Sequence, residues 1–593
     1  MTPIEINHSH DISLADIVRV ARGAPVILAE PTARLLGTRR RQIEAYIAAT
    51  EQPAYGFNRG FGSNVHNRVA AEDLAVLQEN LIRSHACCMG EPAPVDVVRA
   101  TMFLRAKSLS QGHSGVRAEI VARLVEALNR GLTPVVPSFG SVSASGDLAP
   151  LSHIALCLFL GEGDAFVTTA DAAVERLPAS AALERVGLAP LPLEMKEGLA
   201  LNNGVQYSTA LTALAADRLS TILKTALAAT ALSAQVMLGA DTPFRKDLHA
   251  LRPHRGSVVV ADCVFNLMAG SPLREAHLEY DIDGEIQDPY NLRCAAQVLG
   301  PCLELLWRAV RTVTIEANSV TDNPILLKAG RAIKPDSYLG AFVEVVSGGH
   351  FHGMPVAVDA FGLLQAASIM ARLSNMRCVR FVDADRNKGL GPDLKWPGRV
   401  PPAEHWGGLQ YDERAIGRRQ SIQSAMMMPE YTSAGLTNWI WGQAMPNHLF
   451  SLSTDSGQED HVSMAANVAK KAYDVMPRLA EVIAIELAFA AQAAAIRRHA
   501  PAIPSRAPRH DLQNPGATKE WHAVDADKRM LSPVSEEILG VVATCFPTLK
   551  EDRSLAQEIA ALAAAVLAGK IVEAAESQDD YFGAFDLAAD AAG

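Results

Sequence analysis

The chain has 593 residues, enough to bury several hydrophobic cores or one large helical body. An apolar fraction of 49% is typical of a folded globular protein and excludes a largely disordered one. The net charge of −11 argues against a general nucleic-acid-binding surface.

The cysteines and the N-terminus indicate a cellular compartment. The eight cysteines are scattered and form no C-x-x-C pair, which favours neither a structural zinc site nor a disulfide framework. Free thiols are typical of a reducing cytoplasm. The N-terminus lacks the basic and apolar regions of a signal peptide. The most apolar stretch, Ile483 to Ile496, is too short to span a bilayer and contains Glu486. We expect a cytoplasmic protein without a membrane partner.

Helical periodicity dominates the chain. Apolar positions three and four residues apart predict helices over Val65 to Arg83, Val95 to Leu109 and Ala118 to Asn129. Longer Ala/Leu-rich segments with few Gly or Pro are typical of the shafts of a helical bundle: Ser208 to Leu238, Ala295 to Ala317, Val462 to Arg497 and Leu555 to Glu576. Strand signals are few and short, as at Val258 to Val260. The prediction is a mostly α fold.

The pattern divides the chain into three parts. We predict an N-terminal domain over residues 1–206, a central helical bundle over 207–499, and a linker with a helical C-terminal segment over 500–593. Within the bundle, Asp383 to Gln420 is rich in Gly, Pro, Trp and charge. It is too long for an idle connection, which predicts a lid or a binding loop.

The tripeptide Ala144-Ser145-Gly146 has a chemistry of its own. The Gly146 nitrogen can attack the Ala144 carbonyl carbon and close a five-membered ring. Loss of two water molecules then converts Ser145 into an exocyclic methylidene. Glycine suits this reaction because its nitrogen is uncrowded and its backbone tolerates a tight loop. The product, a methylidene-imidazolone, is an electrophile that needs no external cofactor.

By itself the tripeptide is more often a small-residue turn ahead of a helix. Its flanks favour the other interpretation, since Gly140-Ser141 precedes it and Asp147-Leu148-Ala149-Pro150-Leu151-Ser152-His153 follows it. The whole run resembles the signature of the aromatic amino acid ammonia-lyases. Five further blocks between Tyr55 and Met464 occur in the family's order.

Two blocks lie N-terminal to the signature. The segment Tyr55-Gly56-Phe57-Asn58-Arg59-Gly60-Phe61-Gly62 does not complete G-x-G-x-x-G, and no clear strand precedes it, so it is not a phosphate loop. It resembles the family loop that carries the catalytic tyrosine, here Tyr55. In the second block, Ser84-His85 is the pair found in histidine lyases, where tyrosine lyases tend to carry His-Leu and phenylalanine lyases Phe-Leu. The resemblance implies that His85 faces the substrate ring.

Two blocks imply contacts to the polar part of the substrate. Asn203, in Leu201-Asn202-Asn203-Gly204, corresponds to a residue beside the carbonyl of the imidazolone ring, where its amide can stabilise negative charge. Gln287-Asp288-Pro289-Tyr290-Asn291-Leu292-Arg293 matches a block whose Gln287, Tyr290 and Arg293 line the pocket. Tyr290 and Arg293 would share one face of a helix. The planar fork of Arg293 suits a substrate α-carboxylate.

The last block has two stretches. Gly348 to Pro355 resembles a segment whose phenylalanine, here Phe351, packs on the substrate. Gln458-Glu459-Asp460-His461 has the histidine-lyase form, where phenylalanine lyases carry Gln in place of Glu459. A carboxylate there can orient a substrate imidazole. The histidines show no metal-ligand spacing, so we predict no metal.

The resemblance implies an N-terminal domain that bears the electrophile, a long helical bundle, and a homotetramer whose active sites draw on three subunits. Ser84-His85 with Glu459 favours L-histidine as the substrate and urocanate as the product. Arg59, where the family usually has Thr, and His350, where Asn is common, leave a modified histidine open. A phenylalanine or tyrosine lyase, an aminomutase with the same electrophile, and a non-catalytic scaffold also remain as alternatives.

Overall fold

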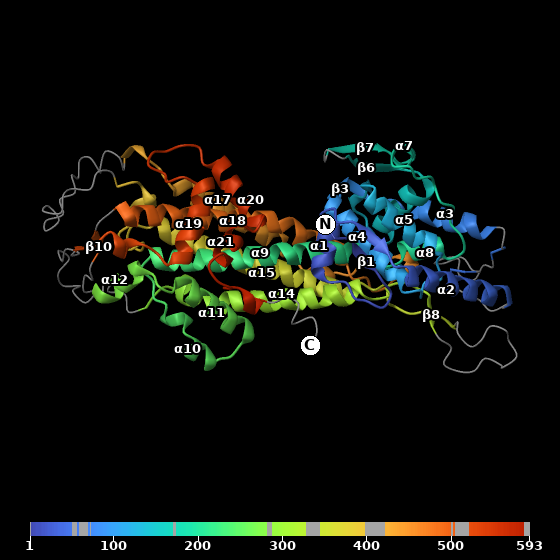
Figure 1. Cartoon of the computed structure of the whole chain (residues 1–593), viewed down its shortest axis with the longest axis horizontal. Helices are drawn as coiled ribbons and strands as arrows, with labels where there is room; N and C mark the ends of the chain where they lie inside the picture. Colours follow the sequence, from blue (N-terminus) through green and yellow to red (C-terminus); the bar gives the residue numbers. More distant parts are fainter. Residues whose placement is uncertain are drawn as a thin grey trace.

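Long helices run along most of the molecule and end in a helical head (Figure 1). The computed structural model describes residues 2–49, 56–57, 69–70, 73–169, 173–280, 287–327, 344–397, 421–499, 502–504 and 521–585. The mostly α fold that the sequence predicts is confirmed.

The head holds the N-terminal part of the chain. Its helices are α1 (Leu14–Ala21), α2 (Glu30–Ala49), α3 (Leu74–His85), α4 (Val95–Ser110), α5 (Ala118–Asn129), α6 (Leu148–Ala155), α7 (Ala179–Arg185) and α8 (Glu197–Asn202). Its strands are β1 (Ile4–Ile6), β2 (Val26–Leu28), β3 (Met89–Pro92), β4 (Leu132–Pro134), β5 (Pro137–Phe139), β6 (Asp164–Thr168) and β7 (Val174–Pro178). β1 pairs with β2 in parallel, whereas β3 pairs with β5, and β4, β6 and β7 form an antiparallel sheet.

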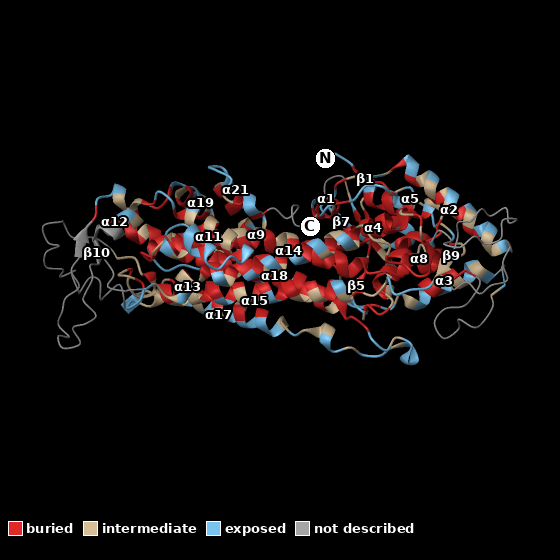
Figure 2. Cartoon of the chain, turned by 90° about the horizontal axis from the view of Figure 1, so that it is seen from below, coloured by how far each residue is buried: buried red, intermediate tan, exposed pale blue. Residues whose placement is uncertain are grey.

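Four long helices make the shaft of the bundle: α9 (Gln206–Val236), α14 (Ala295–Ala317), α15 (Met354–Val382) and α18 (Ala465–His499). α9 and α18 are buried along almost their whole length, because their many small Ala side chains allow neighbouring helices to pack on every side. Around them lie α10 (Lys246–Ala250), α11 (Arg255–Met268), α12 (Pro272–Tyr280), α13 (Tyr290–Arg293), α17 (Met427–Gln443), α19 (Pro533–Cys545), α20 (Ala556–Leu567) and α21 (Lys570–Glu576). Figure 2 shows the buried residues as a continuous core from the head through the shaft.

The remaining strands are short. β8 (Ile325–Leu327) pairs with β9 (Glu344–Val346) and returns the chain from α14 to the head, where the Leu326 amide donates to the His113 carbonyl. β10 (Ala502–Pro504) pairs with β11 (Trp521–Ala523).

Several predicted boundaries are wrong. Val258 to Val260 are not a strand but part of α11, where β-branched residues pack on α14. The helix predicted from Val65 begins at Leu74. The segment from Leu555 to Glu576 is two helices, because Gly569 has a φ of 76° and separates α20 from α21. The linker and most of Asp383 to Gln420 lie outside the described residues; the described part, up to residue 397, contains a short 3₁₀ turn at Pro392–Leu394.

Three helices of the shaft, α9, α15 and α18, are long and apolar enough to cross a membrane by length and composition. The stretch from Ile483 to Ile496, which is too short to span a bilayer by itself, lies inside the 35-residue α18. The expectation of no membrane-length apolar segment is therefore wrong for that helix. The most apolar windows of the three helices are 89%, 61% and 83% buried inside the molecule. Their apolar character therefore serves the bundle core.

Candidate active site

The tripeptide lies in the loop between β5 and α6. Gly146 has a φ of 75° and forms a bridge with Gly204, and a Cβ at position 146 would lie only 2.3 Å from the Gly204 carbonyl oxygen. Only glycine fits there. Its nitrogen is thereby presented beside the Ala144 carbonyl with no side chain in the way, as ring closure requires.

Asp147 holds this loop in place. Its buried carboxylate accepts hydrogen bonds from the Ser141 hydroxyl (2.9 Å), the Ser143 hydroxyl (2.7 Å), and the Ser208 amide (2.7 Å) and hydroxyl (2.8 Å). Burial raises the pKa of Asp147, and these hydrogen bonds oppose that rise. The sequence analysis includes Asp147 in the signature but assigns it no role. The signal that could have found it is a carboxylate directly after the tripeptide, flanked by serines.

Four helix N-termini converge on the same loop. α6 begins directly after Asp147, and α9 gives the Ser208 amide. In α18, the Ala466 amide donates to the Ser143 hydroxyl. α15 begins at Met354, and a Cβ added at the preceding Gly353 would lie only 2.9 Å from the Ser463 hydroxyl. That hydroxyl donates to the Ser143 carbonyl in the loop. Helix N-termini carry partial positive charge, so the site favours negative charge.

Asn203 follows α8 and reaches the tripeptide. Its Nδ2 donates to the Ser145 carbonyl oxygen at 3.1 Å. That oxygen would be the carbonyl of an imidazolone ring formed from the tripeptide. The contact that the resemblance implies is therefore present, and together with the space at Gly146 it shows that these residues fit the methylidene-imidazolone.

Glu459 lies against the reactive serine. The Ser145 hydroxyl donates to Glu459 Oε1 at 2.8 Å, a contact of the unreacted tripeptide, and the Thr454 hydroxyl donates to Oε2 at 2.6 Å. Backbone hydrogen bonds in both directions join Thr454 and Glu459 into a tight loop. Thr454 is a residue that sequence reasoning missed. No pattern marked it, because its role depends on the loop geometry.

His85 is the last residue of α3 and is near enough to Glu459 for that charge to act on it. Its Nδ1 lies 3.0 Å from the Ser84 hydroxyl. Burial lowers the pKa of His85, while the Leu81 backbone and the nearby Glu459 carboxylate act in the opposite direction. In its neutral form an imidazole presents one donor and one acceptor.

Two further predicted site residues are Phe351, which the structure describes, and Tyr55, which it does not. Phe351 is half-buried beside His352, whose Nε2 lies 3.1 Å from the His461 carbonyl, two residues after Glu459. Tyr55 lies outside the described residues. Its neighbour Gly56 is described, and the Gln78 side-chain amide nitrogen lies 3.4 Å from the Gly56 carbonyl while the Gln78 side-chain oxygen accepts from the Leu199 amide.

Tyr290 and Arg293 lie on one face of the short helix α13, as predicted, with the guanidinium 4.6 Å above the tyrosine ring. Arg293 Nε donates to the Asp288 carbonyl at 2.8 Å. Among the described residues its two terminal nitrogens have no hydrogen-bond partner, which leaves the fork open for a carboxylate. Tyr290 is 70% exposed and Gln287 is also exposed.

A family model described as aromatic amino acid lyase matches residues 12–514. The chain belongs to the aromatic amino acid lyase family. Histidine ammonia-lyase from Trypanosoma cruzi is similar, with 28% identity, a TM-score of 0.77 and coverage of 98% of each chain.

Two aminomutases are equally similar to this lyase-family protein. Tyrosine aminomutase from Streptomyces globisporus is 28% identical, with a TM-score of 0.79 and coverage of 98% of this chain and 99% of that chain. Phenylalanine aminomutase from Pantoea agglomerans is 28% identical, with a TM-score of 0.77 and coverage of 95% and 99%. The family and fold are thus shown, and the chain is an enzyme of the ammonia-lyase and aminomutase class.

A single chain of this lyase does not bring all predicted residues together. Ser208, next to the signature, and Ser233, near α13, are 25 residues apart on α9, which is roughly 38 Å at about 1.5 Å per residue. Ser233 contacts Glu486, whose partner Arg377 contacts α13. Figure 2 shows α13 along the shaft and α8 in the head, well apart along the molecule. Ser145 and Arg293 of one chain are too far apart to hold one amino acid.

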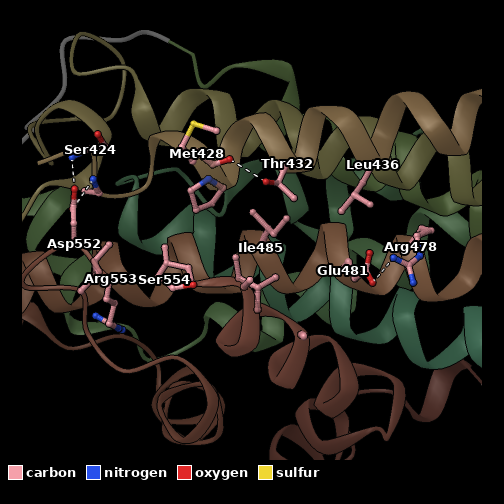
Figure 3. A pocket seen from close by; sticks show the side chains of 17 residues that line it. Ser424, Met428, Thr432, Leu436, Arg478, Glu481, Ile485, Asp552, Arg553 and Ser554 are labelled. Carbon is pink, nitrogen blue, oxygen red and sulfur yellow. Dashed lines mark hydrogen bonds and ion pairs between the residues drawn. The ribbon is translucent and has the colours of Figure 1, made fainter.

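A separate cavity of about 630 Å³ opens between α17, α18 and α20 (Figure 3). Met428, Leu436 and Ile485 give it an apolar lining. Its charged rim is internally paired, since Arg478 contacts Glu481 at 2.8 Å and Asp552 caps the Ser424 and Ala425 amides. No predicted site residue lines it, so the chemistry belongs to the tripeptide and not to this cavity.

Proposed function

We propose that this enzyme eliminates ammonia from L-histidine to give trans-urocanate. The observation that carries the proposal is the hydrogen bond that the Ser145 hydroxyl donates to Glu459, together with the half-buried His85, whose pKa burial lowers and the Glu459 charge raises. A substrate imidazole can donate to the carboxylate and exchange hydrogen bonds with a second imidazole. A phenyl ring offers neither group and would give Glu459 Oε1 no hydrogen-bond donor.

The electrophile in this proposal is the methylidene-imidazolone of Ala144-Ser145-Gly146, which would bind the substrate amine and make it a better leaving group. Asn203 Nδ2 then stabilises negative charge on the oxygen of Ser145. Tyr55 removes the β-proton through its phenolic oxygen, aided by the converging helix N-termini.

In the same proposal, contacts to the substrate divide between its two ends. Arg293 binds the α-carboxylate, with Tyr290 and Gln287 beside it. Phe351 packs on the substrate ring.

These roles require more than one subunit. We propose a homotetramer in which Arg293, Tyr290 and Gln287 of one copy complete the site around Ser145 of another. The separation of roughly 38 Å along α9 supports this arrangement. A row of exposed apolar side chains supports it too, since such patches mark interaction surfaces: Tyr431, Trp439, Trp441, Met445, Leu449, Phe450 and Leu452. The free thiols favour the cytoplasm as its location.

The test is product formation from purified protein with L-histidine, L-phenylalanine and L-tyrosine in parallel, with near-ultraviolet absorbance and ammonia release as readouts. Urocanate from L-histidine alone is the expected result. A β-amino acid product would assign an aminomutase instead. Cinnamate or coumarate as the main product would contradict the role given to His85 and Glu459.

Thr454→Val tests the orientation of Glu459. The change removes the hydroxyl donor to Oε2, which costs about 1.5–3 kcal/mol for a hydrogen bond to a charged group. We expect kcat/KM for L-histidine to fall about 10- to 100-fold. Thr454→Ser retains the hydroxyl and should keep most of the activity. Steady-state kinetics measure both, and equal losses in the two variants would contradict the role of the hydroxyl.

A further inference from the structure

The bundle core contains an ion pair that the proposed chemistry does not use. Arg377 on α15 and Glu486 on α18 are 1% and 0% exposed. Arg377 Nη2 donates to Glu486 Oε2 at 2.9 Å, and the Ser233 hydroxyl on α9 donates to Oε1 at 2.8 Å. The pair therefore joins three helices of the shaft.

Burying two charges is costly, and an apolar pair of similar volume often supports a fold equally well. The pair also makes a hydrogen bond outside itself, since Arg377 Nη1 donates to the Asn291 carbonyl at 3.2 Å. Asn291 Nδ2 in turn donates to the Met376 carbonyl at 2.9 Å. Asn291 thus connects α13 to α15 by two hydrogen bonds, one from Arg377 of the ion pair and one to the backbone of Met376.

α13 is only four residues long and has few anchors of its own. At its N-terminal side, Asp288 accepts a hydrogen bond from the Ala240 amide at 2.7 Å. On its core side Leu292 is buried, and Asn291 makes the hydrogen bonds to α15. The exposed ring of Tyr290, one residue before Asn291, stacks on the guanidinium of Arg293, two residues after it. A shift of Asn291 moves the guanidinium of Arg293 with it.

We infer that Arg377 and Glu486 are positioning residues for the substrate carboxylate. They fix α13 so that the open fork of Arg293 is held in place before the substrate arrives. The inference rests on the proposed function, in which Arg293 binds the α-carboxylate. This role explains how the guanidinium of Arg293 keeps a fixed position although α13 is only four residues long.

The test replaces the pair by apolar side chains, Arg377→Met with Glu486→Leu. We expect a folded protein with an unchanged unfolding temperature to within a few degrees. Its intact mass should show the same loss of two water molecules as the wild type, because the tripeptide lies in the head. For the substrate that the wild type turns over, KM should rise roughly 10- to 100-fold with little change in kcat.

Arg377→Lys is the second variant and keeps the charge pair while losing the fork that reaches Asn291. It should also raise KM. Arg478→Gln with Glu481→Gln removes an exposed ion pair on the same helix, α18, that does not touch α13, and should leave KM unchanged. The Arg377 and Glu486 changes should add little to Arg293→Ala, because both act on one contact.

The outcomes separate the inference from its premise. An unchanged KM in Arg377→Lys and in the apolar double variant, with a raised KM in Arg293→Ala, overturns the positioning role and leaves the carboxylate contact intact. Additive losses with Arg293→Ala overturn it as well. An unchanged KM in Arg293→Ala itself overturns the proposed contact. Should the apolar double variant fail to fold, Arg377→Lys alone decides the question.

Discussion

Ser145→Ala should abolish turnover, by at least about a thousandfold. Only the β-carbon of Ser145, with its leaving hydroxyl, can become a methylidene within this tripeptide. The variant protein should have the mass of its translated sequence, whereas the wild type should be two water molecules lighter. Intact-mass spectrometry and ammonia release measure the two effects on the same sample.

The fold should tolerate this change. An alanine side chain at this position retains the backbone of the loop, and the hydrogen bonds of Asp147 to Ser141, Ser143 and Ser208 do not involve the lost hydroxyl. Far-ultraviolet circular dichroism and thermal unfolding should therefore match the wild type. Turnover that persists in a variant of unmodified mass would refute the self-formed electrophile.

Arg293→Ala should weaken substrate capture by about 2–5 kcal/mol, seen mainly as a raised KM. The fork of Arg293 has two free nitrogens among the described residues, and alanine leaves the carboxylate without a partner. Arg293→Lys should recover only part of the loss, because an ammonium cannot form the paired hydrogen bonds of a guanidinium. The mass loss of two water molecules should be intact in both variants.

A mixture of the two impaired variants tests the shared site. Co-expression of Ser145→Ala with Arg293→Ala chains should restore part of the activity, since mixed assemblies contain sites with Ser145 from one copy and Arg293 from another. Either variant alone should stay impaired. No recovery in mixed assemblies, verified by differently tagged chains, would show that the two residues do not serve one site across subunits.

Local sequence patterns predicted three of the four long shaft helices, α9, α14 and α18, but not α15. The α14 boundaries, Ala295 to Ala317, and those of α5 follow directly from apolar periodicity and from the breaks at their ends. The pattern failed where the same residues fit two structures. Val258 to Val260 have a β preference, but they lie in α11, which packs against α14.

The candidate site divides in the same way. Ala144-Ser145-Gly146, Asn203 and Glu459 were predicted from motifs, and the structure places them within hydrogen-bond distance of one another. Thr454 could not be predicted, because a threonine five residues before a glutamate is common and gains its meaning only in a tight loop. The same holds for Arg377 and Glu486, 109 residues apart in the chain.

The sequence by itself determined the chemistry, because the reactive tripeptide and its flanking motifs are contiguous and carry their reactivity in the residue types. The tertiary structure decided the placement. It packed Glu459 against Ser145 across 314 residues of chain, and the length of the buried α9 separates α13, which contains Arg293, from the head, which contains Ser145. Such separations follow from helix length and packing, which no local motif encodes.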